Sequence, residues 1–406
     1  MKNRAAGILA ALFFLEFVVK GTILPLTSLY CRDYLGFDGI RTGLVLTTET
    51  VAAFLAPAVL IFLADRVIRV EKLLVMNQLA ASLLLFLVPS FRAFAPVFIL
   101  FFLFNIFHKP DLPLLNAITF RNLDRSGKNS YGAFRVWGTI GWIGAAVIFS
   151  CIWMNTSLAL PFGRTFGGLF YIAGTAALAS SMLLLFGQRH FRQDRSERGR
   201  AGGSGFFRAL REMNRRTRLR FGTFILICIV MTMQDHYYFM GISPFLKDTG
   251  TAEGNIALII SLGMITEVVA MFALRFLLDR FGIGRIMAAG AFFSVLKYML
   301  FISAPGGSPV IIGILCHGPV SAFFLACTYI YLDSFSRPEN RAAFHQFYSL
   351  AVSAPASLLG YMLGGLVFDS MGSSYNLFWA VPAVTGALSL AAILFFIKPV
   401  DGQERV

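Results

Sequence analysis

The sequence has few charged residues for its length. Asp, Glu, Lys and Arg make up 14% of its 406 residues, while 57% are hydrophobic and the mean hydropathy is +0.71. A soluble domain carries about 25% charged residues. The composition therefore excludes an ordinary soluble protein and predicts a chain that crosses a membrane many times.

Cysteine is scarce as well, and the familiar catalytic motifs are missing. The five cysteines are scattered, mostly inside apolar runs, with no Cys-x-x-Cys or Cys/His ligand spacing: Cys31, Cys151, Cys228, Cys316 and Cys327. No catalytic triad, Walker loop or dinucleotide-binding glycine motif is present. We therefore expect no disulfide, metal or cofactor. A membrane-embedded enzyme or lipid-handling protein is the alternative from a different functional class.

Twelve apolar stretches are each long enough for a membrane-spanning helix, which takes about 20 residues. They cover residues 6–30, 41–64, 72–90, 94–118, 131–154, 166–187, 221–246, 254–278, 284–304, 308–332, 342–368 and 374–397. The first stretch contains Glu16 and Lys20 and lacks a small-residue cleavage site, so we interpret it as a retained helix and not a signal peptide.

Most of the net charge of +14 lies in alternate segments between these stretches. The positive-inside rule then places both termini in the cytoplasm. The longest polar segment, 188–220, contains eleven arginines and divides the chain into six-helix halves at 1–187 and 221–406. It is interpreted as a cytoplasmic linker whose basic part can lie on anionic headgroups.

Short matches between the halves indicate an internal repeat. Ala-Asp-Arg at 64–66 is echoed by Leu-Asp-Arg at 278–280, and Ala-Phe-Arg at 133–135 by Ala-Phe-His at 343–345. Each pair occupies equivalent ends of equivalent spans, which favours a parallel repeat of six helices.

The segment 131–143 carries the most distinctive polar face. Arg135, Thr139 and Trp142 follow helical spacing and share one face. The glycines at 132, 138, 141 and 144 let a neighbouring helix approach closely. Arg135 either faces a substrate cavity or extends to the cytoplasmic interface, and the spacing leaves both interpretations open.

Twelve spans, a six-plus-six repeat and the turn formed by Asp65, Arg66 and Arg69 resemble the major facilitator superfamily. Within it, the chain is most similar to the bacterial nucleoside:proton symporter family. The stretches that carry this resemblance are LEFVVKGTILPLTSLY at 15–30, FDGIRTGLVLTTETVAAFLAPAVLIFLADR at 37–66, LLNAITF at 114–120, RVWGTIGWI at 135–143, SLGMITEVVAMFALRFLLDRFGIGRIM at 261–287 and NRAAFHQF at 340–347.

The resemblance implies proton-coupled nucleoside import by alternating access between two six-helix halves. It also implies a multi-pass protein of the bacterial inner membrane, which we expect to be a monomer with nucleoside and protons as its partners and no nucleic acid. A carrier of a small sugar or an aromatic acid is the alternative, and a required Lys20 or Arg135 paired with a substrate carboxylate would favour the acid.

The substrate residues that the resemblance implies are Arg135, Thr139, Trp142, Gln234 or His236, and Glu267. Gln234 and His236 remain alternatives because the helix register there is open. Two positions depart from the family pattern: Ala322 stands where an aspartate is expected, and Lys20 where a tryptophan is expected.

Three groups are candidates for proton coupling. Glu267 should lie near the bilayer midplane, where burial disfavours its charged form and suits a group that takes up a proton. Glu16 and Lys20, at i and i+4, can form an ion pair within the membrane. That pair is either structural or part of the coupling mechanism. His108, His317 and His345 are interpreted as packing residues.

The arginines and aspartates at the cytoplasmic ends of equivalent spans are gating candidates. These residues are Asp65, Arg66, Arg69, Asp279 and Arg280. We expect them to form ion pairs that open and close during alternating access, without touching the substrate.

Overall fold

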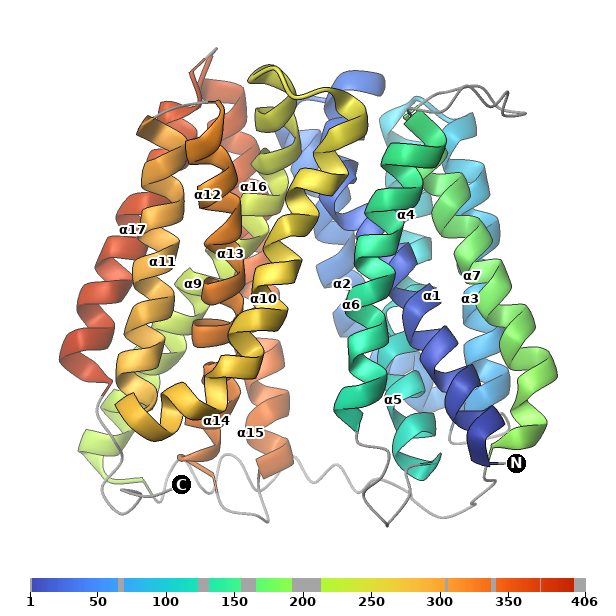
Figure 1. Ribbon diagram of the computed structural model, residues 1–406, viewed down its shortest axis with the longest axis horizontal. Coiled ribbons are helices and arrows are strands. Elements are labelled where there is room, and N and C mark those ends of the chain that lie inside the picture. Colours follow the sequence, from blue (N-terminus) through green and yellow to red (C-terminus); the bar gives the residue numbers. More distant parts are fainter. Residues whose placement is uncertain are drawn as a thin grey trace. The chain divides into compact units, whose positions relative to one another are not determined.

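The computed structural model describes most of the chain. The described residues are 2–64, 69–122, 131–154, 166–191, 213–303, 306–336, 341–372 and 374–397. Within these ranges every regular element is helical (Figure 1). The predicted all-helical fold is confirmed.

Eleven helical stretches among the described residues are long and apolar enough to cross a bilayer. Helix α2, with 26 residues, is also long enough and completes the predicted twelve. In chain order the spans are α1 (Lys2–Leu29), α2 (Gly39–Ala64), α3 (Val70–Leu87), α4 (Phe94–His108) with α5 (Asp111–Asn122), α6 (Tyr131–Val147), α7 (Gly168–Gly187), α9 (Arg215–Asp248), α10 (Glu253–Phe281), α11 (Ile283–Ser303), α12 (Ser308–Leu315) with α13 (His317–Val320) and α14 (Cys327–Asp333), α15 (Arg341–Tyr348) with α16 (Ala354–Ser370), and α17 (Tyr375–Phe396).

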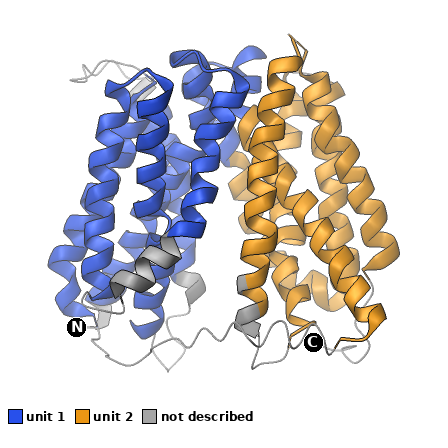
Figure 2. Cartoon of the chain, turned by 180° about the vertical axis from the view of Figure 1, so that it is seen from behind, with its two compact units in different colours: residues 1–196, 242–261 blue, residues 197–241, 262–406 orange. Residues whose placement is uncertain are grey.

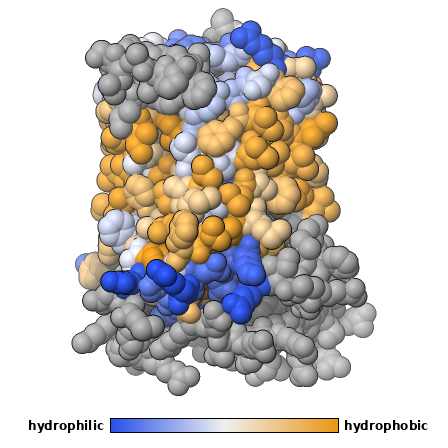
Figure 3. All heavy atoms as spheres, turned by 90° about the vertical axis from the view of Figure 1, so that its right-hand side faces the viewer, coloured by the Kyte–Doolittle hydropathy of each residue, from blue (hydrophilic) through white to orange (hydrophobic). Residues whose placement is uncertain are grey.

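Large apolar side chains remain exposed on these helices, as a lipid-facing surface requires. Phe272 of α10 and Phe395 of α17 are 78% and 74% exposed. On the face shown in Figure 3, apolar side chains form a broad band between two polar edges. Such a band matches the hydrocarbon layer of a bilayer, because polar groups cost free energy inside it.

The chain divides into two compact units (Figure 2). Unit 1 comprises residues 1–196 and 242–261, and unit 2 comprises residues 197–241 and 262–406. The end of α9 and the start of α10, residues 242–261, group with unit 1. Most of the expected linker, 192–212, lies outside the described residues.

In unit 1, α1 packs closely against α6 because both helices have glycines at the contact. A Cβ atom on Gly141 would lie 2.2 Å from the main-chain oxygen of Phe14, and one on Gly21 would lie 2.9 Å from Cα of Trp142. This close approach agrees with the expectation from the glycine spacing, and it sets the position of Trp142 against α1.

The fourth and tenth spans are both interrupted within the membrane. The fourth is α4 followed by α5, with Lys109 and Pro110 between them, and the tenth breaks at Cys316 before α13. Proline has no backbone N–H and therefore weakens a helix at this point. The breaks place His108 at the end of α4, Asp111 at the start of α5, and His317 at the start of α13.

Candidate functional site

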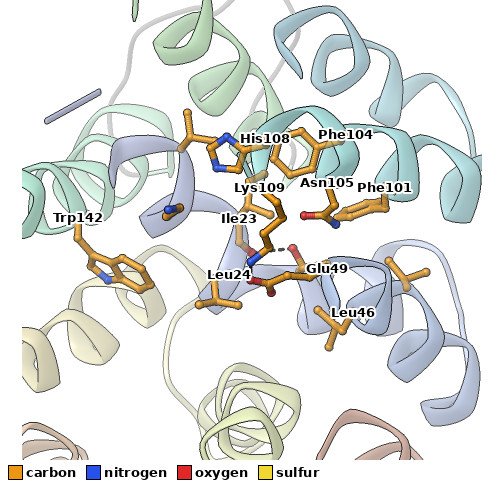
Figure 4. A pocket seen from close by; sticks show the side chains of 14 residues that line it. Ile23, Leu24, Leu46, Glu49, Phe101, Phe104, Asn105, His108, Lys109 and Trp142 are labelled. Carbon is orange, nitrogen blue, oxygen red and sulfur yellow. Dashed lines mark hydrogen bonds and ion pairs between the residues drawn. The ribbon is translucent and has the colours of Figure 1, made fainter. Parts of the chain in front are cut away.

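A pocket in unit 1 is lined by side chains from α1, α2, α4 and α6 (Figure 4). It contains about 560 Å³ of empty space, a volume that includes its opening to solvent. Its polar lining residues are Lys20, Thr27, Glu49, Asn105, His108, Lys109 and Trp142. The remainder of its wall is apolar, as is typical of sites for small molecules.

Polar groups on one side of the pocket are already paired. Lys109 forms an ion pair with Glu49 of α2 (Figure 4), and Asn105 donates a 3.0 Å hydrogen bond to the hydroxyl of Thr48. Opposite charges in a partly buried pair compensate each other, so this wall presents hydrogen-bonding groups with little net charge. It suits a neutral polar ligand.

The predicted ion pair on α1 is present. Lys20 Nζ lies 3.1 Å from Glu16 Oε1, and the Glu16 side chain is 1% exposed. His108 Nε2 lies 3.7 Å from the same Glu16 oxygen, and its Nδ1 lies 3.6 Å from Asp111 Oδ2. Asp111 also accepts a 3.1 Å hydrogen bond from the amide of Asn77. The pair therefore belongs to a larger buried cluster.

The three residues predicted on the polar face of α6 lie in different surroundings. Trp142 is 8% exposed and lines the pocket. The guanidinium of Arg135 lies over the ring of Phe17 on α1, 4.2 Å from its centroid. Thr139, which lies between these two residues in the sequence, is half-buried. Of the three, the described structure brings only Trp142 to the pocket wall.

Gln234 in unit 2 is buried and already hydrogen-bonded. Its Oε1 accepts a 2.8 Å bond from Ser294, and its Nε2 donates a 3.3 Å bond to Thr385. His236 is half-buried with its ring edge to face against Tyr361, at 5.0 Å between centroids. A ligand that used the Gln234 amide would have to replace these two bonds.

Glu267 is half-buried on α10, where this helix approaches α13 very closely. A Cβ atom on Gly318 would lie 2.2 Å from the main-chain nitrogen of Glu267. Thr266 donates a 2.8 Å hydrogen bond to the main-chain oxygen of Leu315 at the same contact. The main chain at Glu267 is therefore held against the break in the tenth span.

A buried lysine was not singled out by the sequence patterns. Lys297 of α11 is 1% exposed, and its Nζ lies 4.5 Å from the ring centroids of both Tyr238 and Tyr298. Asp235 acts on it electrostatically and lies 3.9 Å from His317 Nε2. One lysine within an apolar span gives no periodic signal, so only packing reveals its acidic neighbour.

The gating candidates are only partly described. Asp65 and Arg66 lie outside the described residues, whereas Arg69, Asp279 and Arg280 are exposed. Other ion pairs join the end of the first span to the end of α9 within unit 1. Arg32 donates hydrogen bonds of 2.6 and 2.8 Å to Asp248, and Lys247 Nζ lies 2.6 Å from Asp33.

The sequence analysis missed His108, Lys109, Asp111 and Glu49 as members of one site. The available signal was the run His-Lys-Pro-Asp at 108–111, in which a proline within an apolar span is flanked by three ionisable residues. Charged groups inside a membrane span are rare and mark functional sites. His108 is therefore more than a packing residue, since it lies between two carboxylates. His345, interpreted likewise, lies 2.6 Å from Asp333.

Comparison with known proteins gives consistent results over the whole chain. A family model described as nucleoside H⁺ symporter matches residues 4–401. YegT of Escherichia coli is 26% identical over 409 residues, covering 96% of this chain and 92% of that protein. The nucleoside permease NupG of Escherichia coli is 22% identical over 376 residues, covering 89% of this chain and 87% of that one.

The fold is also found among solved structures. The crystal structure of the nucleoside transporter NupG matches with a TM-score of 0.82 at 19% identity, covering 98% of this chain and 100% of that one. A bacterial homologue of the human lysosomal transporter Spinster, in an inward-facing and unoccupied conformation, matches with a TM-score of 0.73 at 15% identity over 98% of this chain and all of that one. At these identities the likeness concerns the fold alone.

Proposed function

The chain belongs to the nucleoside H⁺ symporter family, and we propose that it holds its nucleoside beside Trp142 in the unit 1 pocket. It is a multi-pass membrane transporter of the major facilitator fold and not an enzyme. Its reaction is proton-coupled nucleoside import. The pocket lining is the observation that carries the proposal, because an indole beside paired polar groups matches the two parts of a nucleoside.

The base and the sugar of a nucleoside need different kinds of contact in this pocket. A nucleobase gains about 1–3 kcal/mol from stacking on an aromatic side chain, and Trp142 is the aromatic group of α6 on the pocket wall. The ribose hydroxyls need hydrogen-bond partners, which Asn105, Lys109 and Glu49 offer. Arg135, Thr139, Gln234, His236 and Glu267 remain predicted substrate residues by resemblance.

A carboxylate-bearing substrate fits this pocket less well. Lys20 lines the pocket and is 25% exposed, so it is the cation that an acid would address. Its charge is already matched by Glu16 at 3.1 Å, and Lys109 is matched by Glu49. A neutral ligand leaves both pairs intact, which favours a nucleoside over an aromatic acid.

The remaining assignments are proposals of the same kind. We propose Glu267, Glu16 and Lys20 as proton-coupling groups, and Asp65, Arg66, Arg69, Asp279 and Arg280 as gating residues. The distribution of arginines supports an inner-membrane protein with both termini in the cytoplasm, two six-helix halves at 1–187 and 221–406 and a linker at 188–220. We expect it to work as a monomer.

The test is uptake of labelled uridine and adenosine into proteoliposomes, with and without an inward proton gradient. Trp142→Ala should raise the KM for both nucleosides by roughly 5- to 150-fold, the equivalent of one lost stacking contact. Trp137→Ala is the matched control, because Trp137 lies on the same helix and is 46% exposed. Equal KM changes in the two variants would refute the pocket assignment, and absence of any nucleoside uptake would refute the substrate.

Glu267→Gln tests the coupling proposal separately. The variant should still equilibrate nucleoside across the membrane, but it should no longer accumulate nucleoside when a proton gradient is imposed. Full gradient-driven accumulation by this variant would remove Glu267 from the coupling mechanism.

A further inference from the structure

Each unit contains a carboxylate beside a histidine, and the two pairs occupy equivalent sequence positions. Histidine is followed by proline two residues later in both broken spans, at His108 and at His317. Their acidic partners also match, since Glu16 precedes Pro25 by the same interval as Asp235 precedes Pro244. The distances are 3.7 Å for His108 to Glu16 and 3.9 Å for His317 to Asp235. The repeat has therefore duplicated an acid–histidine pair.

The pair in unit 1 is extended by a second carboxylate. Glu16, His108 and Asp111 are 1%, 5% and 0% exposed. Of their facing atoms, His108 Nε2 and Asp111 Oδ2 are buried without a hydrogen-bond partner in the described structure, whereas Glu16 Oε1 has Lys20 Nζ at 3.1 Å. Leaving buried polar atoms without such bonds costs about 1–3 kcal/mol each. A proton shared within this triad would provide the missing donor.

The charges around the triad also favour a bound proton. Three carboxylates and two lysines of unit 1 surround His108, with ion-pair contacts or electrostatic interactions linking them. They are Glu16, Glu49, Asp111, Lys20 and Lys109. With all five ionised, one negative charge is unmatched, and burying an unmatched charge is unfavourable. One added proton makes the network neutral.

Other groups near the triad do not change this count. Asn77 of α3 is neutral and donates to Asp111, and Arg121 of α5 is paired with Glu71 at 2.5 Å. Arg135 of α6 lies against the ring of Phe17. The membrane-spanning part of α7 carries no Asp, Glu, Lys or Arg.

The equivalent acid–histidine pair in unit 2 has a different net charge around it. Asp235 has one buried cation, Lys297, as its electrostatic counterpart. These two charges cancel when His317 is neutral, so this pair needs no proton. Glu267 of α10 is the further acid beside this region, and it is half-buried. The duplicated pair has thus kept its geometry but not its charge.

A metal ion would be the other occupant for a Glu, His and Asp whose ligand atoms lie within 4.8 Å of one another. Lys20 Nζ, however, is 3.1 Å from the Glu16 oxygen that would bind the metal. An ammonium group at that distance repels a divalent metal ion about twice as strongly as it repels a single proton, and it occupies space beside the oxygen that a metal ion would need. The geometry therefore favours a proton over a metal.

We propose that the coupling proton of transport is held by the Glu16–His108–Asp111 triad of unit 1. The proposal rests on the proposed proton-coupled function and adds His108 and Asp111 to its machinery. With the proton bound, the network is neutral and stable beside a loaded pocket. Loss of the proton leaves a buried negative charge, which links proton release to the rearrangement that releases substrate.

The test uses Asp111→Asn in proteoliposomes, with two readouts for uridine. Asparagine retains an oxygen for the Asn77 hydrogen bond and removes the unmatched charge, so the network becomes neutral without a proton. We expect uridine exchange to persist, while accumulation driven by a 100 mV proton gradient falls from a limit of about 50-fold to no accumulation. Adding uridine should also no longer make the outer medium more alkaline.

Glu16→Gln is the second variant and should give the same separation of the two readouts. His317→Gln is the matched control. This variant should still accumulate uridine when a proton gradient is imposed. Gradient-driven accumulation by Asp111→Asn or Glu16→Gln would overturn the proposal. Loss of exchange in both would overturn it as well, because the neutral network must still move nucleoside.

Two further results would contradict the assignment. Loss of accumulation in His317→Gln with intact exchange would place the proton in both pairs. Accumulation driven by a sodium gradient in the absence of a proton gradient would replace the proton with a metal ion. These results can be distinguished from a failure of the proposed function. In that case the wild-type protein itself would not exchange nucleosides.

Discussion

The contact between α1 and α6 predicts that one glycine cannot carry even a methyl group. A Cβ atom at position 141 would lie 2.2 Å from the main-chain oxygen of Phe14, a distance that real Cβ atoms do not adopt. The neighbouring atom belongs to the main chain, so no side-chain rotation can relieve the overlap. Gly141→Ala should therefore push the two helices apart and move Trp142 relative to the pocket.

The magnitude follows from two opposing terms. Alanine is favoured over glycine in an exposed helix by up to about 1 kcal/mol, whereas overfilling a packed contact costs about 1–3 kcal/mol or more. An added Cβ at Gly7 has nothing within 4 Å, so Gly7→Ala should show the helix preference for alanine without any packing cost. At Gly144 the added atom would meet only the Phe14 ring at 3.3 Å, so a small shift of that ring absorbs the change.

The assay is reversible unfolding of the purified protein by titration with sodium dodecyl sulfate. We expect the free energy of unfolding to rise for Gly7→Ala, to change little for Gly144→Ala, and to fall by about 1–3 kcal/mol for Gly141→Ala. The Gly141→Ala protein should also bind uridine more weakly, because Trp142 is displaced. An unfolding free energy for Gly141→Ala equal to that of Gly7→Ala would refute the close approach of the two helices.

Three further predictions concern other contacts. Gly318→Ala should lower both stability and nucleoside accumulation, since its Cβ would lie 2.2 Å from the Glu267 nitrogen; Gly222→Ala, with open space around it, should change neither. Asp235→Asn should cost about 3–5 kcal/mol in the same titration because Lys297 loses its counter-charge, and adding Lys297→Met should recover most of that loss. Asp248→Asn should cost at most about 1 kcal/mol, and less at high salt, because exposed ion pairs are weak and screened.

The number and order of the spans were readable from the sequence. Apolar stretches must be helical in a bilayer, since no water is present to satisfy the main chain, and each of the twelve predicted stretches corresponds to a helical span. Local spacing also predicted contacts within one helix. The Glu16–Lys20 ion pair, at i and i+4, is present at 3.1 Å, because helix geometry alone brings such residues together.

The candidate site was only partly predictable. Trp142 was identified from its helical face and its resemblance to the family, and it lines the pocket. Gln234, which the resemblance alone implies as an alternative to His236, has its amide engaged by Ser294 and Thr385. Resemblance can mark a position, but it carries no information about which neighbours a side chain will bond.

The sequence by itself thus determined the class of protein, its helices, its family and the pairs that lie one helical turn apart. Only the tertiary structure decided that His108 bridges Glu16 and Asp111, and that Lys297 belongs with Asp235. Glu16 and His108, like Asp235 and Lys297, come from different helices that are far apart in the chain. Hydropathy measures how well each segment tolerates lipid, whereas the meeting of charges from separate segments depends on how the helices pack.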